Sequence, residues 1–210
     1  MKAQVSVVSV ILISGIVISL VGASFMWGMP MVTKRTVVTE YTSAEAFIKK
    51  VNDVIIDIAN TGAGSETLEI PVGSIKVTPE GVEDPDRNSI SLDIITDQPM
   101  IFNASKIYLG GAGFEDVTSE VGVYGEASPG VITLSTATVS TGYGISLNIH
   151  YRELDTKTSP LKGYKIVLTT DSGGIETGAG KMTISFDKTY TSGTAQNGGP
   201  LVVTEIKVSI

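Results

Sequence analysis

The sequence predicts an α+β protein, in which a long hydrophobic N-terminal helix precedes a mainly antiparallel β-sandwich (Ig-like) globular domain. Three observations lead to this fold class. No charged residue lies between Lys2 and Lys34, apolar residues recur at helical spacing over residues 43–59, and short β-like segments fill the chain from residue 65 onward. With 210 residues, the chain is long enough for one or two domains.

The opening segment is predicted to be one hydrophobic helix over residues 4–33, which serves as a membrane anchor or as the core of a filament. A helix of about 20 apolar residues crosses the hydrocarbon core of a bilayer, and the apolar region of a cleaved secretion signal has about 7–15 residues. The segment exceeds both lengths. Pro30 lacks a backbone N–H, so we expect the helix to kink or end near Gly28 or Met29.

Small side chains recur through this helix. Gly15 and Ser19 are four residues apart, and so are Ser24 and Gly28. Small residues at this spacing let two helices approach closely. We therefore expect a role in helix packing for Gly15, Ser19, Gly22, Ser24 and Gly28.

Residues 34–64 are expected to form a connector, over residues 36–43, and then an amphipathic helix over residues 43–59. The apolar stripe of this helix comprises Ala44, Phe47, Ile48, Val51, Val54, Ile55 and Ile58, and its polar face comprises Lys49, Lys50, Asn52, Asp53 and Asp57. Thr42 and Glu45 fit a capping box, and Gly62 fits a C-terminal cap. The stripe favours packing on the chain's own domain. The pattern leaves open whether this helix continues the first one, as a long bent helix, or folds back separately.

Residues 65–210 are predicted to form a β-rich extracellular domain. Nine segments have the alternation or the β-branched composition of strands, and turns rich in Gly, Pro, Asn and Asp separate them. Alternation places Ile206, Val208 and Ile210 on one face, so the C-terminus is expected to belong to a sheet. The segments are residues 67–70, 73–78, 89–96, 100–110, 130–139, 143–154, 163–170, 180–187 and 200–210.

Composition argues against several classes of function. The chain has no cysteine, one histidine (His150) and a formal net charge of −7. Without cysteine there are no disulfides and no thiolate ligands, and one histidine leaves little for a zinc site or a Ser/His/Asp triad. An acidic chain without a basic stripe is not expected to bind nucleic acid. We expect no enzyme activity, no catalytic residues, no metal site and no cofactor.

Two kinds of local motif have ordinary structural interpretations. Residues 83–88 gather carboxylates, but they lack the Gly and the final Glu of an EF-hand loop, so a solvated turn is the better interpretation. The glycine-rich segments 110–113 and 173–174 match no phosphate-binding fingerprint and are interpreted as turns.

Two single residues are also candidates for a role. Asn103 begins the one N-x-[ST] sequon, which makes it a glycosylation candidate if the domain lies outside the cell and the site is exposed. His150 follows Ile149 on the opposite face of a predicted strand, and we expect it at the strand surface rather than in a catalytic site.

The first six residues, Met-Lys-Ala-Gln-Val-Ser, resemble the start of archaeal type IV pilin precursors. Such precursors have a very short basic leader, a small residue before the cleavage site, and a mature chain that opens with Gln-x-Ser. The resemblance implies a possible leader peptide over residues 1–3, with Ala3 and Gln4 as the processing residues. The order of leader, long apolar helix and acidic β-rich domain is similar as well. Archaellins share this order, but their mature N-terminus differs, so the pilins are the nearer resemblance.

This resemblance implies a structural subunit, a pilin, of an extracellular type IV pilus-like filament that serves surface adhesion. Hydrophobic helices would bundle in the core and the β-domains would face solvent. The partners implied are other copies of the chain in a helical homopolymer, the membrane before assembly, a prepilin peptidase and the pilus assembly machinery. The subunit would be inserted in the membrane first and found on the cell surface afterwards.

A second interpretation stays open: a membrane-anchored or secreted monomeric β-sandwich binding module, such as an adhesin or a minor pilin. Val21 and Ala23 before Ser24 satisfy the small-residue pattern of a signal-peptidase site, which would release a domain that begins at Ser24. Against this interpretation, the apolar run continues past that point through Trp27.

Overall fold

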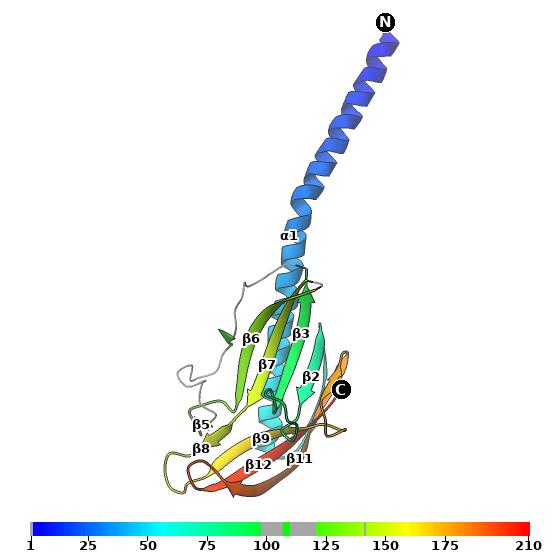
Figure 1. The fold of residues 1–210 in the computed structure, drawn as a ribbon. Coiled ribbons are helices and arrows are strands. Elements are labelled where there is room, and N and C mark those ends of the chain that lie inside the picture. The colour runs from blue at the N-terminus through cyan, green and yellow to red at the C-terminus, as the bar shows by residue number, and fades with distance from the viewer. Residues whose placement is uncertain (1, 98–106, 110–120, 141) are drawn as a thin grey trace. The chain divides into compact units, whose positions relative to one another are not determined.

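The structure is a computed structural model that describes residues 2–97, 107–109, 121–140 and 142–210, with side chains from residue 8 onward. The chain divides into two compact units, Met1–Glu40 and Tyr41–Ile210. The first unit is helical throughout its described residues, and the second contains the end of the same helix and all the described strands. The predicted α+β fold class is therefore confirmed (Figure 1).

The helix α1 (Lys2–Thr61) is longer than the sequence predicts. It continues through Pro30, so of the two outcomes expected near Gly28 or Met29 the end of the helix is wrong, and the kink stays a prediction. A proline removes one hydrogen bond from a helix, whereas a complete break would leave several backbone groups unpaired. The connector expected at residues 36–43 is helical instead, and Thr42 lies inside α1, so the predicted capping box is wrong as well.

Threonine hydroxyls explain why the expected connector is compatible with a helix. The hydroxyl groups of Thr33, Thr36 and Thr39 donate hydrogen bonds to the carbonyl oxygens four residues earlier, at 2.9, 3.2 and 2.9 Å. Each hydroxyl is therefore satisfied by the helix itself. The helix ends where predicted, because Gly62 has a φ of +67° and its N–H donates to the carbonyl oxygen of Ile58 at 3.0 Å.

The described strands of the second unit form two sheets of six strands each (Figure 1). The first sheet has the order β1-β11-β12-β9-β8-β5, and the second has the order β10-β2-β3-β7-β6-β4. Most neighbours are antiparallel, but β12 pairs parallel with β9 and β5 pairs parallel with β8. The strand bounds are β1 Ser65–Glu69, β2 Ser74–Thr78, β3 Ser89–Thr96, β4 Ile107–Tyr108, β5 Val121–Val123, β6 Gly130–Val139, β7 Gly142–Tyr151, β8 Glu153–Asp155, β9 Gly163–Thr169, β10 Glu176–Gly178, β11 Lys181–Thr194 and β12 Pro200–Ser209.

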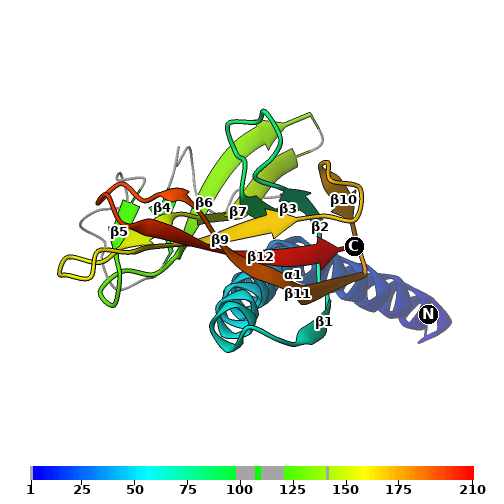
Figure 2. The same ribbon diagram turned by 90° about the horizontal axis from the view of Figure 1, so that it is seen from below.

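The core of the second unit joins the end of α1 to both sheets. The apolar stripe predicted on residues 43–59 is buried, and none of its members is more than 9% exposed. Inward residues of neighbouring strands lie opposite each other, such as Ile90 with Ile149 and Leu92 with Leu147, so they form a continuous apolar layer. Figure 2 shows this part of α1, in cyan, beside β1 and β11. Burial of the stripe therefore holds the helix to its own domain, as predicted.

Asn52 does not lie where the pattern places it. It was expected on the polar face of the helix, but it is only 8% exposed. A helix that contacts two sheets buries a wider arc than a helix on one sheet, and the arc here extends beyond the apolar stripe. The sequence pattern shows which side of the helix is buried, but not how far around the helix the burial extends.

The predicted strands are confirmed in outline, because each of the nine segments contains strand residues. Two strands, β5 and β10, are absent from the prediction, and each has three residues, too few to show a period. The predicted segment 143–154 divides at Arg152 into the end of β7 and the start of β8. Strand β11 runs on to Thr194, past the predicted end at Asp187. At the C-terminus, Ile206 and Val208 are fully buried within β12, whereas Ile210 follows the strand and is 37% exposed.

Candidate assembly interface

The apolar part of α1 exposes its side chains. Over residues 8–33 the exposed large hydrophobic side chains have between 51% and 87% of their surface accessible, with Trp27 the highest. The most apolar 18-residue window has a mean hydropathy of 2.4, and none of it is buried. By length and composition, this helix is able to cross a membrane. An exposed apolar surface of this extent marks a contact with lipid or with other proteins.

Small residues lie on two opposite sides of this helix. Gly15, Ser19 and Gly22 follow the i, i+4, i+7 spacing, which places them on one side. Ser24 comes nine residues after Gly15, about two and a half helical turns, so it lies on the opposite side together with Gly28. The five residues predicted to pack helices therefore form two groups. Two different contact surfaces are what a head-to-tail polymer requires of each subunit.

A shallow groove of about 550 Å³ follows the first of these two sides. Gly15 and Ser19 lie in it, and the larger Ile16 and Leu20 flank them. Apart from its chain neighbours and the adjacent turns of the helix backbone, a Cβ atom added at Gly15 or Gly22 would meet no described atom within 4 Å. Nothing described in the subunit requires glycine at these positions, which favours a close neighbour as the reason for them.

The hydroxyl of Ser24 adds no unsatisfied donor to this surface. Its Oγ atom donates to the carbonyl oxygen of Leu20 at 2.8 Å. A serine bonded in this way is compatible with an apolar environment, because its polar group is paired within the helix.

Some predicted site residues are not tested by the structure. Ala3 and Gln4 lie in α1, but their side chains are not among those described. Asn103 and residues 110–113 lie outside the described residues. Processing at Ala3 and glycosylation at Asn103 stay predictions.

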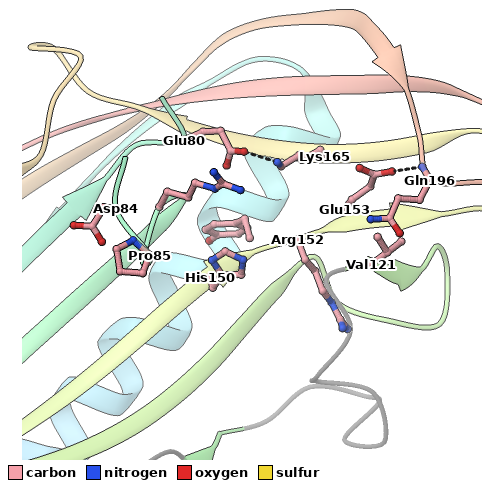
Figure 3. A pocket seen from close by; sticks show the side chains of 11 residues that line it. Glu80, Asp84, Pro85, Val121, His150, Arg152, Glu153, Lys165 and Gln196 are labelled. Carbon is pink, nitrogen blue, oxygen red and sulfur yellow. Dashed lines mark hydrogen bonds and ion pairs between the residues drawn. The ribbon is translucent and has the colours of Figure 1, made fainter. Parts of the chain in front are cut away.

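A polar pocket of about 450 Å³ lies beside the crossing from β7 to β8 (Figure 3). His150 lines it and is exposed on β7, as predicted. Glu80 forms an ion pair with Lys165 at 2.6 Å, and a carboxylate oxygen of Glu153 accepts a hydrogen bond from the backbone N–H of Gln196 at 2.9 Å. Among its described lining residues there is no serine, threonine or cysteine, so the pocket does not assemble a Ser/His/Asp triad.

Of the carboxylates in residues 83–88, that of Asp84 has partners within the fold. Asp84 accepts a hydrogen bond from the backbone N–H of Asp86 at 2.8 Å, and its other carboxylate oxygen lies 3.8 Å from the ammonium of Lys76. The predicted interpretation as a turn is therefore confirmed. In the part of the chain that the structure describes, no group of three or more His, Cys, Asp or Glu side chains is arranged to hold a metal ion.

A second recess, called the helix recess below, lies beside α1 in the second unit and has a volume of about 320 Å³. Two of its residues, Asn52 and Gly130, were not singled out by the sequence. The one local signal was a glycine at the start of a predicted strand, which often marks close approach of another group. The recess is lined by Lys49, Asn52, Asp53, Ile56, Leu109, Ser128, Gly130 and Ile132.

Comparisons with known proteins assign no family. No protein-family model, curated protein or solved structure matches this chain. The architecture, with a long apolar N-terminal helix followed by a β-rich domain, is compatible with that of a pilin. The function is therefore argued from the residues and their geometry.

Proposed function

We propose that this chain is the structural subunit of an extracellular filament similar to an archaeal type IV pilus. The apolar helices of many copies bundle in the filament core, and the acidic β-domains face solvent. Before assembly, the same helix holds each subunit in the membrane. The observation that carries the proposal is the exposure of the apolar segment, whose large side chains are 51% to 87% accessible.

The length of the segment favours a filament core over a simple anchor. As a helix, the uncharged residues from Ala3 to Thr33 rise about 46 Å, whereas the hydrocarbon core of a bilayer is about 30 Å thick. A membrane anchor does not need the additional length of about 16 Å. A bundle of helices has a use for it, because each further turn adds packing surface.

The small residues support the same conclusion. In a membrane, apolar helices gain little by leaving lipid for one another, so close packing has to supply the preference for association. Glycines without a structural reason inside the subunit, on a helix with two small-residue sides, provide that packing. Because the two sides differ, each contact is heterologous, and such contacts extend into a helical polymer.

The proposal includes a processing step and an assembly step. A prepilin peptidase cleaves between Ala3 and Gln4, and the pilus assembly machinery takes the subunit from the membrane into the growing filament. The exposed β-domains then provide the surface for adhesion. No catalytic activity and no nucleic-acid partner belong to this function.

The test is to replace Gly15 and Gly22 together by leucine in the full-length chain and to measure the filaments sheared from the cells. We expect filaments to be lost while the subunit stays in the membrane, because leucine blocks the close approach of a neighbour. A Cβ atom at either position meets no close neighbour in the described subunit, and leucine forms helix better than glycine. A loss of filaments is therefore not explained by a damaged subunit. Ser9→Leu, which adds bulk between the two small-residue sides of the helix, is the matched control.

The alternative function is a membrane-anchored or secreted monomeric binding module, and the polar pocket of Figure 3 is the observation that favours it. This alternative predicts that Gly15→Leu/Gly22→Leu has no effect on amount, location or stability. Filaments that form normally from that variant would contradict the pilin proposal.

A further inference from the structure

The helix recess presents a hydrogen-bond acceptor for which the described residues provide no donor. The side-chain oxygen Oδ1 of Asn52 is buried and has no hydrogen-bond partner in the described structure, and the residue is 8% exposed. The oxygen points across the recess toward Gly130, where even a Cβ atom would overlap it. Buried acceptors are normally paired, so this oxygen indicates a donor that comes from outside the subunit.

Charge at the mouth of the recess indicates that this donor is a cation. Asp53 lines the recess and Asp57 follows one helical turn later, and both are exposed. Neither forms an ion pair with a described residue. Lys49, the one cation among the described lining residues, is held by Glu45 at 2.6 Å, so it does not neutralise Asp53.

The apolar walls of the recess favour a ligand whose cationic group is carried on an apolar chain. Ile56, Leu109 and Ile132 line it together with the polar groups. Arginine and lysine combine a methylene stem with a cationic head. Arginine fits best, because its guanidinium carries five donors and can bond a carboxylate and an amide oxygen together.

Two cations that form no ion pair with a described residue lie next to each other in α1. Lys34 and Arg35 end the apolar segment of α1, are exposed, and form no ion pair with a described residue. Most lysines of the second unit are already paired with acids of that unit. The first unit has a formal charge of +2, from Lys2, Lys34 and Arg35 against Glu40. Because the whole chain has a net charge of −7, the second unit has a formal charge of −9.

We propose that the helix recess binds Arg35 of a second copy of this chain, with Lys34 of that copy facing Asp53 and Asp57. The guanidinium donates to the Asn52 side-chain oxygen and to the Asp53 carboxylate, while the arginine stem lies against the apolar wall. This inference rests on the proposed filament, in which copies contact one another through α1. The contact extends the apolar helix bundle into the polar part of the chain and fixes the register between neighbours.

The experiment is a charge swap in the full-length chain, read out as the amount of pelletable filament sheared from cells. Arg35→Glu and Asp53→Arg are each expected to lower the filament yield at least about tenfold, because each places like charges together. The double variant, which restores opposite charges, is expected to return to within about twofold of wild type. Asn52→Leu, which removes the acceptor, is expected to lower the yield without changing the charge.

Matched controls separate this contact from a general effect of charge. Lys162→Glu and Glu83→Lys reverse exposed charges that form no ion pair with a described residue and lie elsewhere in the second unit. Both are expected to leave the filament yield unchanged. Thermal unfolding followed by circular dichroism shows whether each variant is folded.

The outcomes distinguish the contact from the filament. A wild-type chain that never forms filaments would refute the proposed function. Filaments formed equally by wild type and Arg35→Glu would overturn the contact alone. If Arg35→Glu lowers the yield, the swap fails to restore it, and binding to vesicles of anionic phospholipid falls, then Arg35 contacts lipid headgroups and the recess proposal is wrong.

Discussion

The side-chain amide of Asn88 donates a hydrogen bond to the carbonyl oxygen of Tyr151 at 2.9 Å and a second one to that of Ile166 at 2.8 Å. Its oxygen accepts a hydrogen bond from the N–H of Leu168 at 2.9 Å. Tyr151 is the last residue of β7 in one sheet, whereas Ile166 and Leu168 belong to β9 in the other. One fully buried amide therefore ties the two sheets together, next to Arg152, where the chain crosses from β7 to β8.

Replacement of Asn88 is expected to destabilise the β-domain. Asn88→Gly keeps the left-handed backbone, for which φ is +56°, but loses all three side-chain hydrogen bonds. We expect a loss of about 2–4 kcal/mol in the free energy of unfolding, because three buried backbone groups lose a partner. Asn88→Ala adds about 1–2 kcal/mol for the left-handed conformation. Urea unfolding followed by circular dichroism measures both, and two variants as stable as wild type would show that the amide does not join the sheets.

The close approach of Gly130 to Asn52 predicts an energetic coupling between the two. A methyl group on Gly130 would overlap the Asn52 side-chain oxygen and lie 3.2 Å from Cε1 of Tyr151. Gly130→Ala is therefore expected to cost about 1–3 kcal/mol of stability in the wild-type background. With Asn52→Ala the cost should fall below about 1 kcal/mol, because the overlapping atom is gone. Equal costs in the two backgrounds, measured by urea unfolding, would place the strain elsewhere.

The buried phenol of Tyr151 predicts a loss of stability in alkali. Burial, and next to it the charge of Asp53, raise the pKa of Tyr151 well above its usual value. The unfolded chain releases this proton near about pH 10, while the folded chain keeps it. The contribution of the protonated phenol to the free energy of unfolding is therefore complete below about pH 10 and is lost as the pH rises further. Burial and the neighbouring Glu45 raise the pKa of Tyr41 to about 12, so Tyr41 acts in the same direction.

The variant Tyr151→Phe tests this pH dependence. Its free energy of unfolding should fall less than that of wild type between about pH 9 and about pH 11, since one of the perturbed phenols is gone. Near pH 7 it should lose less than about 1 kcal/mol, because the buried hydroxyl has no hydrogen-bond partner in the described structure. Tyr124→Phe, at an exposed tyrosine, is the control. A Tyr151→Phe profile that runs parallel to wild type would contradict the role given to burial.

The one tryptophan reports directly on helix packing. Trp27 is 87% exposed in the subunit and lies in the segment proposed to form the filament core. Acrylamide quenching of its fluorescence is expected to fall severalfold when detergent-free subunits assemble, because neighbouring helices cover it. Trp27→Phe supplies the background signal. Quenching that is unchanged in pelleted filaments would put this end of the helix outside the packed core.

The sequence predicts the parts of the fold that depend on one local period. The stripe from Ala44 to Ile58 is buried as predicted, and Ile145, Leu147 and Ile149, at alternate positions of the predicted strand 143–154, are buried as well, because each set faces a single core. The helical connector was not predictable in the same way. Thr36 and its neighbours satisfy their hydroxyls equally well on a helix or in a turn, so local composition does not decide between the two.

Local sequence patterns did not predict which residues connect distant segments of the chain. The hydrogen-bond partners of Asn88 lie about 60 to 80 positions further along the chain. Asn88 stabilises the fold through these distant hydrogen bonds, which its neighbours in sequence do not reveal. Asn52 and Gly130 are likewise important because they contact each other where α1 meets β6, and the sequence does not show this contact. For the candidate interface, the small residues were found from their spacing in the sequence, whereas their division into two sides was recognised once the segment was seen as one continuous helix.

The most direct test of the filament proposal is the N-terminal residue and the intact mass of the protein in filaments sheared from its native cells. The account predicts a chain that begins at Gln4, keeps the whole apolar helix and pellets as filaments. A chain that begins at Ser24 in the soluble fraction, or an intact chain that stays a membrane-bound monomer, would contradict it.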